Sequence, residues 1–381
     1  MIPARPSGVP ELLTSPFSAN RQDLSMAKLF TPIRFRDTEI KNRIFVSPMC
    51  QYSAEEGIAN HWHLVHLGGL AVGGAGLIIV EATAVAPEGR ITPFCLGLWS
   101  DAHTQAFKPI VDFIKQQGAI PAIQIAHAGR KASCDAPWRD GKFLPPEQGG
   151  WQTFAPSAIP VTPEHGTPHA LSREEIQQVA AQFHAAAKRA LDAGFEVLEL
   201  HCAHGYLLHE FLSPLSNRRE DEYGGSLENR CRLALDIARD LRTLWPQDKP
   251  VFVRISATDW VEGGWDIDQS IQFAKWLKEA GIDLIDCSSG GLILDAKIPA
   301  GPGYQTEFAQ RIRHETGIAT GAVGLITSAV QAEHILVSGQ ADVVMLARKL
   351  LSDPHWPLHA AKELRTDVTW PAQYVRAKHI E

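Results

Sequence analysis

The sequence predicts one α/β domain built as a (β/α)8 barrel, and three observations support this. The chain has 381 residues, of which 45% are hydrophobic and 21% charged, which is enough to bury a substantial core. Short apolar segments alternate along the chain with segments of helical spacing, a pattern typical of a parallel sheet covered by helices. Eight such units over roughly 320 residues indicate a closed barrel.

The eight expected strands are short, apolar, and followed by polar residues or glycine. They cover residues 43–49, 76–83, 119–125, 196–203, 251–256, 284–291, 319–324 and 341–348. The expected helices cover residues 61–73, 101–118, a segment that starts at 172, then 207–212, 227–244, 267–280, 304–316, 327–338 and 356–364. We expect Asp101 to cap the second helix, and Ser172 with Glu175 matches a capping box at the start of the third.

Three segments lie outside this repeat. Residues 29–44 alternate apolar and polar positions around 36–38, which predicts a β-hairpin as a lid over the amino-terminal end of the barrel. Residues 132–171 are rich in Pro, Gly and Trp, and an excursion of that length after the third strand usually caps a functional site. Residues 1–28 are expected to be a flexible extension. The barrel domain, including its C-terminal tail, then covers residues 29–381.

Composition argues against several classes of partner. The net charge is −7, which disfavours nucleic acids and anionic membranes as partners, and no apolar run reaches membrane-spanning length. The six cysteines are irregularly spaced and form no C-x-x-C pair. Because residues 1–25 also lack the apolar core of a secretory signal, we expect a cytoplasmic protein with free thiols.

One stretch, residues 199–206, carries the strongest chemical signal. It runs from the fourth strand into a helix and contains His201, His204 and Tyr206. In a barrel these side chains would leave the carboxyl end of a strand together, on the active-site face. Two imidazoles and a phenol could hold a carbonyl or nitro oxygen and deliver a proton beside it. A zinc site would need a third ligand, which His127 could supply, and a buried structural pair is a further alternative.

Polar residues at the other expected strand ends would join this rim. Gly324 and Arg348 follow the seventh and eighth strands, the position where barrels commonly bind a phosphate group, and Arg348 could contact it with two hydrogen bonds. Arg254 lies within an apolar strand. It could face an anionic ring edge, or it could pair with a core carboxylate.

Four motifs, at residues 47–52, 123–131, 199–206 and 221–230, resemble the old yellow enzyme family, and in particular its bacterial thermophilic-like subclass that includes xenobiotic reductase A. The resemblance extends over residues 29–376. It implies a barrel that holds FMN non-covalently. NADPH or NADH would reduce the flavin, which would then pass hydride from N5 to an activated alkene in a ping-pong cycle. The substrates implied are α,β-unsaturated carbonyl or nitro compounds.

The resemblance also assigns roles to residues. His201 and His204 would hold the activating oxygen of the substrate, Tyr206 would donate the proton, Tyr52 would share in substrate binding, and Cys50 would lie beside the flavin and tune its potential. The residues expected to bind FMN are Ser47, Pro48, Met49, Cys50, Ala84, Gln124, Arg254, Gly324, Ala347 and Arg348.

The C-terminal residues 371–376 resemble a tail that inserts an arginine into the neighbouring subunit's site. This implies a homodimer, or a dimer of dimers, in which Arg376 is a shared substrate-binding residue; a solvated terminal Arg376 is the alternative. Two other functions compete with the ene-reductase: a metal-dependent barrel hydrolase or aldolase, and a non-catalytic FMN-binding protein. A yellow colour would exclude the first of these, and oxidation of NADPH would exclude the second.

Overall fold

The computed structural model describes residues 26–379, so most of the expected extension lies outside the described residues. Eight parallel strands close a barrel in the order β10-β11-β12-β3-β4-β5-β8-β9, as predicted. The barrel strands are β3 (Ile44–Val46), β4 (Leu77–Ala84), β5 (Ile120–Ala126), β8 (Val197–Cys202), β9 (Val251–Ser256), β10 (Leu284–Ser288), β11 (Ala319–Ala322) and β12 (Val343–Leu346).

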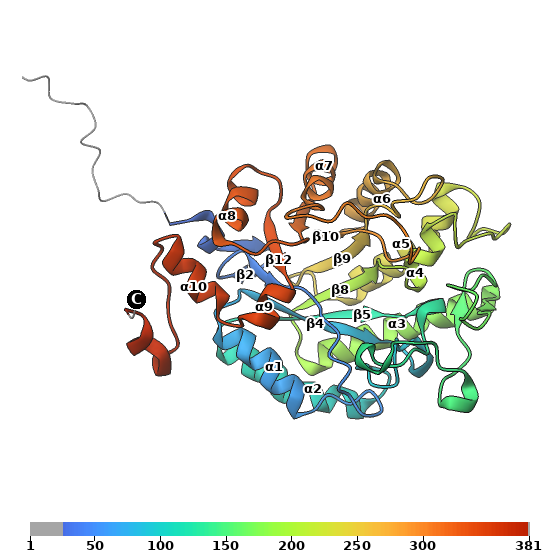
Figure 1. Ribbon diagram of the computed structural model, residues 1–381, viewed down its shortest axis with the longest axis horizontal. Coiled ribbons are helices and arrows are strands. Elements are labelled where there is room, and N and C mark those ends of the chain that lie inside the picture. The colour runs from blue at the N-terminus through green and yellow to red at the C-terminus, as the bar shows by residue number, and fades with distance from the viewer. Residues whose placement is uncertain (1–25, 380–381) are drawn as a thin grey trace, which may run out of the picture.

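Helices surround this barrel on the outside (Figure 1). The longer ones are α1 (His61–Val72), α2 (Asp101–Gln116), α3 (Arg173–Ala193), α5 (Leu227–Leu244), α6 (Ile267–Glu279), α7 (Thr306–Thr316), α8 (Ala329–Val337) and α10 (Trp356–Glu363). Two short helices, α4 (Leu207–Leu212) and α9 (Arg348–Ser352), follow β8 and β12 directly. None of the described helices is long and apolar enough to cross a membrane.

The amino-terminal end of the barrel is filled by aromatic side chains. A hairpin of β1 (Ile33–Phe35) and β2 (Thr38–Ile40) places Phe35 with its ring centroid 5.3 Å from that of Phe252. Phe45 stacks on Phe252 at 6.4 Å. Phe45 and Phe252 have no exposed surface, and such a packed cluster leaves no room for a ligand inside this end. The polar residues after the strands therefore gather at the opposite end.

Several expected boundaries need correction. Ser100 is the N-cap of α2, and Asp101 is its first helical residue; Asp101 thus lies one position inside the helix. The expected strand 284–291 ends at Ser288 because Gly290 and Gly291 adopt φ angles of +67° and +89°, which a strand cannot accommodate. Arg348 begins α9 instead of ending the last strand. The capping box of Ser172 and Glu175 is confirmed.

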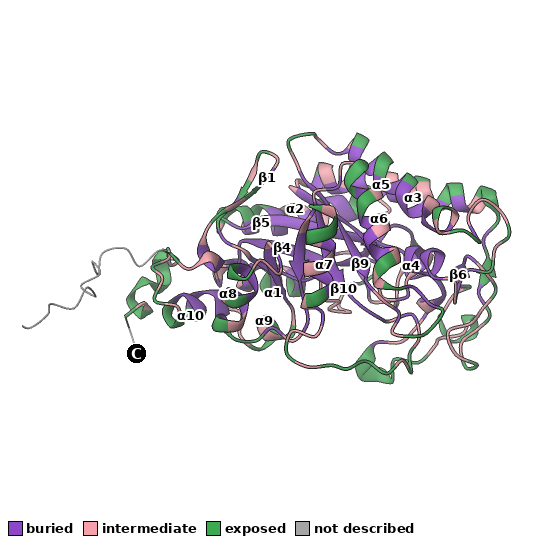
Figure 2. Ribbon diagram, turned by 90° about the horizontal axis from the view of Figure 1, so that it is seen from above, coloured by how far each residue is buried: buried purple, intermediate pink, exposed green. Residues whose placement is uncertain are grey.

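The excursion after β5 is mostly irregular. Its regular parts are short turns of 3-10 helix and a parallel pair of two-residue strands, β6 (Phe154–Ala155) and β7 (His169–Ala170). Figure 2 shows the barrel strands buried, whereas the segments around β6 and the C-terminal tail are largely half-buried or exposed. The excursion therefore adds surface and loops to the barrel, with little core of its own.

Candidate active site

The predicted trio comes together at the carboxyl end of β8. The ring of His201 lies 5.3 Å from that of His204 and 5.1 Å from that of Tyr206, with interplanar angles of 89° and 85°. Burial lowers the pKa of both histidines well below the usual value, and the positive charge of Arg254 lowers it further. Both imidazoles are therefore neutral at pH 7, and each can offer one N–H donor.

Hydrogen bonds decide which nitrogen of His201 carries the proton. The amide of Ala203 donates to His201 Nδ1 at 3.2 Å, so the proton is on Nε2. Within residues 26–379, the hydrogen bond that His201 makes through its ring is the one at Nδ1, which leaves the Nε2 donor available to a ligand. His204 is held differently, because its Nε2 lies 2.7 Å from Ser288 Oγ and its amide donates to Ser256 Oγ at 2.9 Å.

The backbone between β8 and α4 has an unusual conformation. His204 and Gly205 are both left-handed, with φ angles of +61° and +71°. A side chain at Gly205 would collide with the carbonyl oxygen of Gly291, so only glycine fits there. This turn aims His204 and Tyr206 toward the same side as His201.

Lys131 ties this turn to the rest of the rim. The sequence assigned it no role, although it is the last residue of the motif at residues 123–131. Its Nζ donates to the carbonyl oxygens of His204 and Gly291, both at 2.8 Å. The same atom lies 5.1 Å from the centroid of the Tyr206 ring, a distance suited to a cation–π contact. Burial lowers the pKa of Lys131 to about 8.

Cys50 and Tyr52 follow β3 and lie near enough to Tyr206 to contribute to the rise of its pKa. Burial raises the pKa of the Cys50 thiol well above its usual value and also raises the pKa of Tyr52, so both keep their protons at pH 7. Trp138 of the excursion packs edge-on against Tyr52 with centroids 5.8 Å apart. Trp151 instead donates to the Glu88 carbonyl oxygen at 2.9 Å. Of these two tryptophans, Trp138 is therefore the one at the rim.

Glu81 is a second residue that the sequence did not reveal. Its Oε2 accepts the amide hydrogen of Gln51 at 2.9 Å, which fixes the backbone between Cys50 and Tyr52. The side chain is 3% exposed, and burial raises its pKa to about 8. The Tyr52 backbone also has a positive φ of 48°, so this loop needs a partner that holds it.

Arg254 forms the ion pair that the sequence left as one of two alternatives. Its Nε lies 3.0 Å from Asp286 Oδ2, and both side chains are buried. Next to this pair, Gln124 Nε2 donates to Glu199 Oε1 at 2.8 Å. Burial raises the pKa of Glu199 and of Asp286. One guanidinium thus faces two carboxyl groups beneath the rim, which favours keeping one of the two protonated.

The carboxyl ends of β11 and β12 enclose a cavity of about 170 Å³, whose lining includes Gly324, Ala347 and Arg348. Gly324 has a φ of +124°, and a Cβ there would lie 3.0 Å from Gln305 Nε2. At the end of β3, the buried hydroxyl of Ser47 has no partner among the described residues. A small cradle plus an unpaired buried hydroxyl on the same rim fits a phosphorylated cofactor such as FMN.

The described residues contain no group of three or more His, Cys, Asp or Glu side chains that could hold a metal ion. His127, the potential third ligand, accepts a hydrogen bond from the amide of Gly129 at 3.0 Å through Nδ1. Burial lowers its pKa to about 4.

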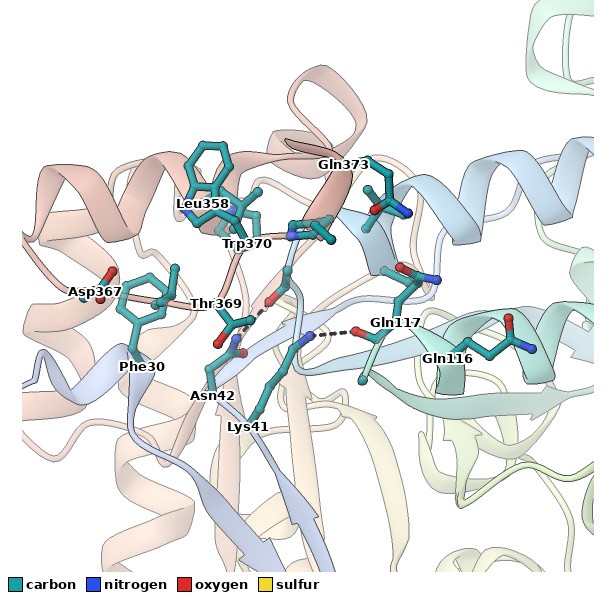
Figure 3. A pocket seen from close by; sticks show the side chains of 18 of the residues that line it. Phe30, Lys41, Asn42, Gln116, Gln117, Leu358, Asp367, Thr369, Trp370 and Gln373 are labelled. Atoms are coloured by element: carbon teal, nitrogen blue, oxygen red, sulfur yellow. Dashed lines mark hydrogen bonds between the residues drawn. The ribbon is translucent and has the colours of Figure 1, made fainter. Parts of the chain in front are cut away.

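Arg376 is not brought to this site within the chain. It is exposed in the short helix Ala372–Ala377, to which Gln373, labelled in Figure 3, also belongs. Trp370 and Gln373 of the tail line a cavity together with Lys41, Asn42 and Gln117, and these three precede β3 and β5. The tail thus lies at the amino-terminal end of the barrel, opposite His201.

Comparison with known proteins gives one consistent result. Residues 28–367 match the NADH:flavin oxidoreductase / NADH oxidase family. NADPH dehydrogenase from Bacillus velezensis is 49% identical over 352 residues, covering 92% of this chain and 99% of that protein. The Bacillus subtilis NADPH dehydrogenase is also 49% identical, over 351 residues that cover 92% of this chain and 98% of that one. The old yellow enzyme homologue from Zymomonas mobilis superposes with a TM-score of 0.74 at 28% identity, covering 90% and 94% of the two chains.

The raised pKa of Glu81 gives a prediction about stability. A carboxyl whose folded pKa is about 8 stabilises the fold fully at low pH, and this contribution is lost as pH rises toward and through 8. The variant Glu81→Gln stays neutral and can still accept from Gln51. Its melting temperature relative to the wild type should therefore rise between pH 6 and pH 9, by about 1–4 °C for each kcal/mol gained.

A matched control is Glu39→Gln, which removes a carboxylate from the exposed pair with Arg34. Its melting-temperature difference from the wild type should change little over the same pH range. An equal difference at pH 6 and pH 9 for Glu81→Gln would contradict the assignment.

Proposed function

The chain belongs to the NADH:flavin oxidoreductase / NADH oxidase family, and from this we propose that it is an ene-reductase, which reduces the activated C=C bond of α,β-unsaturated carbonyl or nitro compounds. It is an NAD(P)H-dependent flavin oxidoreductase with FMN as cofactor and NADPH or NADH as reductant. The observation that carries the proposal is the cluster of His201, His204 and Tyr206, which combines oxygen-binding donors with a proton source.

FMN, when bound, supplies the hydride for this chemistry. The residues that would hold it are Ser47, Pro48, Met49, Cys50, Ala84, Gln124, Arg254, Gly324, Ala347 and Arg348. The unpaired hydroxyl of Ser47 and the cavity beside Gly324 and Arg348 support this assignment. Arg254 would stabilise negative charge on the ring edge, with its own charge partly balanced by Asp286.

The two histidines would bind the oxygen of the activating group. His201 offers its Nε2 hydrogen, and His204 can turn its hydrogen bond from Ser288 toward the ligand. Because these donors are neutral and buried, they stabilise a developing enolate charge more strongly than they would in water. Tyr52 and Cys50 would border the same substrate.

Tyr206 would protonate the α-carbon. Burial raises the pKa of its phenol well above the usual value, so the proton is present at pH 7 and is given up only to a strong base such as an enolate carbon. Lys131 lies over the ring, where its positive charge would ease the loss of that proton. The nicotinamide would occupy the same pocket as the substrate, which makes turnover ping-pong.

The test of this function is an anaerobic titration of the purified protein with NADPH and then 2-cyclohexenone, followed by visible absorbance. A yellow protein should bleach with NADPH and recover its colour with the enone. A flavin that bleaches but never recovers with any activated alkene would contradict the ene-reductase. Double-reciprocal plots should be parallel, and intersecting plots would exclude the ping-pong cycle.

A second prediction concerns the proton. The variant Tyr206→Phe should slow reoxidation by the enone by about 10²–10⁴-fold, the usual contribution of a positioned acid, and should slow reduction by NADPH far less. Stopped-flow measurement of each half-reaction would show this. Equal effects on both half-reactions would remove Tyr206 from the role of proton donor.

We further propose that Arg376 serves the site of a neighbouring subunit in a homodimer or a dimer of dimers. The tail lies at the end of the barrel away from its own site, so within the chain Arg376 has no ligand to contact. Tyr374 and Val375 next to it are exposed by 43% and 51%. Exposed apolar side chains beside a charged one are suited to burial in an interface.

The prediction for Arg376→Ala is a KM for the enone about tenfold higher, the effect of losing one charge-assisted hydrogen bond. Arg239→Ala, which changes an exposed pair on α5, is the control and should have no effect. Mixing Arg376→Ala chains with inactive Tyr206→Phe chains should restore sites with the KM of the wild type, because one mixed site then has both natural residues. No recovery on mixing, with the oligomer intact, would contradict sharing.

A further inference from the structure

A buried imidazole–carboxylate pair lies directly beneath the turn that carries His204 and Tyr206. His209 belongs to α4, and Asp259 follows β9. His209 Nε2 lies 3.0 Å from Asp259 Oδ1, and neither side chain has any exposed surface. The reaction proposed above does not use either group.

The other nitrogen of His209 holds the centre of the turn. The amide of Gly205 donates to His209 Nδ1 at 2.9 Å. Nδ1 must therefore be unprotonated, and the ring proton is on Nε2, facing the carboxylate. The imidazole thus connects Asp259 to the one residue that separates His204 from Tyr206.

Asp259 is itself firmly held. Its Oδ2 accepts from Ser213 Oγ at 2.6 Å and from the Trp265 amide at 2.8 Å. Burial alone would raise the pKa of this carboxyl, but His209 and these donors together lower it, so Asp259 is ionised at pH 7. In the described part of the chain, the imidazole is the group that faces Oδ1.

The turn depends on such contacts because His204, which is not a glycine, adopts a left-handed conformation that is unfavourable by itself. The amide hydrogens on either side of Gly205 are bound as well: His204 donates to Ser256 Oγ, and Tyr206 donates to the Ala203 carbonyl. If Gly205 lost its acceptor, a buried donor would be left unpaired, and the peptide could rotate. Such a rotation would move His204 and Tyr206 relative to each other.

We propose that His209 is a positioning residue of the proposed reaction. Its Nδ1 fixes the Gly205 amide and thereby the places of His204 and Tyr206, while Asp259 selects the tautomer that leaves Nδ1 free to accept. The inference rests on the proposed roles of His204 and Tyr206.

Two variants separate the two contacts of the ring. In His209→Asn, the side-chain oxygen takes the place of Nδ1 and can accept from Gly205, but nothing reaches Asp259. In His209→Gln, the longer amide can donate to Asp259, but the acceptor for Gly205 is lost. Ser213→Ala is the matched control, because it removes a donor to the same carboxylate and leaves the imidazole in place.

The measurement is reoxidation of the NADPH-reduced, FMN-loaded protein by 2-cyclohexenone and, separately, by dioxygen, which has no carbonyl for the histidines to hold. His209→Gln should slow the enone reaction about 10–100-fold, the usual cost of a misplaced catalytic group, and change the dioxygen reaction less than about threefold. His209→Asn and Ser213→Ala should keep the enone rate close to that of the wild type. Both should nevertheless lower the melting temperature, because each removes a partner of the Asp259 carboxylate.

A purely structural role would make enone rates follow melting temperatures across the three variants, and that result would overturn the inference. If the wild type itself is not reoxidised by the enone, the proposed function fails instead. Should the His209 variants fail to fold, nitrogen NMR of the wild type decides: an Nδ1-protonated His209 at pH 7 would exclude the inference. Faster amide exchange of residues 203–208 in His209→Gln, compared with His209→Asn, would support it.

Discussion

The site depends on how the chain leaves β8. Within four residues it must pass from a buried strand into α4 while His201, His204 and Tyr206 all point to one side. The left-handed conformations of His204 and Gly205 achieve this, and the close approach of Gly291 admits only glycine at the second position. Lys131 then ties the two facing carbonyl groups together. The geometry of the proposed site is therefore held by the backbone and by two other segments of the chain, those of Lys131 and Gly291.

Burial sets the charge state of nearly every group on this rim. It keeps the histidines neutral, the thiol of Cys50 and the phenols of Tyr52 and Tyr206 protonated, and Glu81 largely protonated near neutral pH. The charged groups, Arg254 and Lys131, lie below or beside these neutral donors. Such an arrangement stabilises negative charge that develops on a ligand, and the carboxylates Asp286 and Asp259 are each paired with a side chain beneath the rim. It also makes the groups on the rim depend on exclusion of water.

The sequence predicted the barrel well because each strand is encoded by a local pattern. An apolar run with β-branched residues ends at glycine or at polar residues. It also predicted that His201, His204 and Tyr206 would meet, since all three lie at the carboxyl end of one strand. Lys131, Glu81 and His209 were assigned no role because their importance lies in contacts with residues 30 to 160 positions away or, for His209, in one hydrogen bond to a backbone amide. No local pattern encodes the distant contacts of Lys131 and Glu81. The bond from Gly205 to His209 spans only four residues, but Asp259, which faces the other ring nitrogen, lies 50 positions along the chain. The shift of the α2 cap from Asp101 to Ser100 is a one-residue boundary error, which is usual for helix ends.

The two ends of the barrel differ for a steric reason: one end is packed with aromatic side chains, and the other carries the hydrogen-bonding groups. Phe35, Phe45 and Phe252 fill the amino-terminal end, so hydrogen-bonding groups can gather only where the strands end. The C-terminal tail nevertheless packs at the filled end, against the segments that precede β3 and β5. A cationic side chain there, Arg376, cannot serve a ligand bound within the same barrel. For the proposed role of Arg376, a second chain must bring the carboxyl end of its barrel to that tail, so assembly and substrate recognition depend on the same contact.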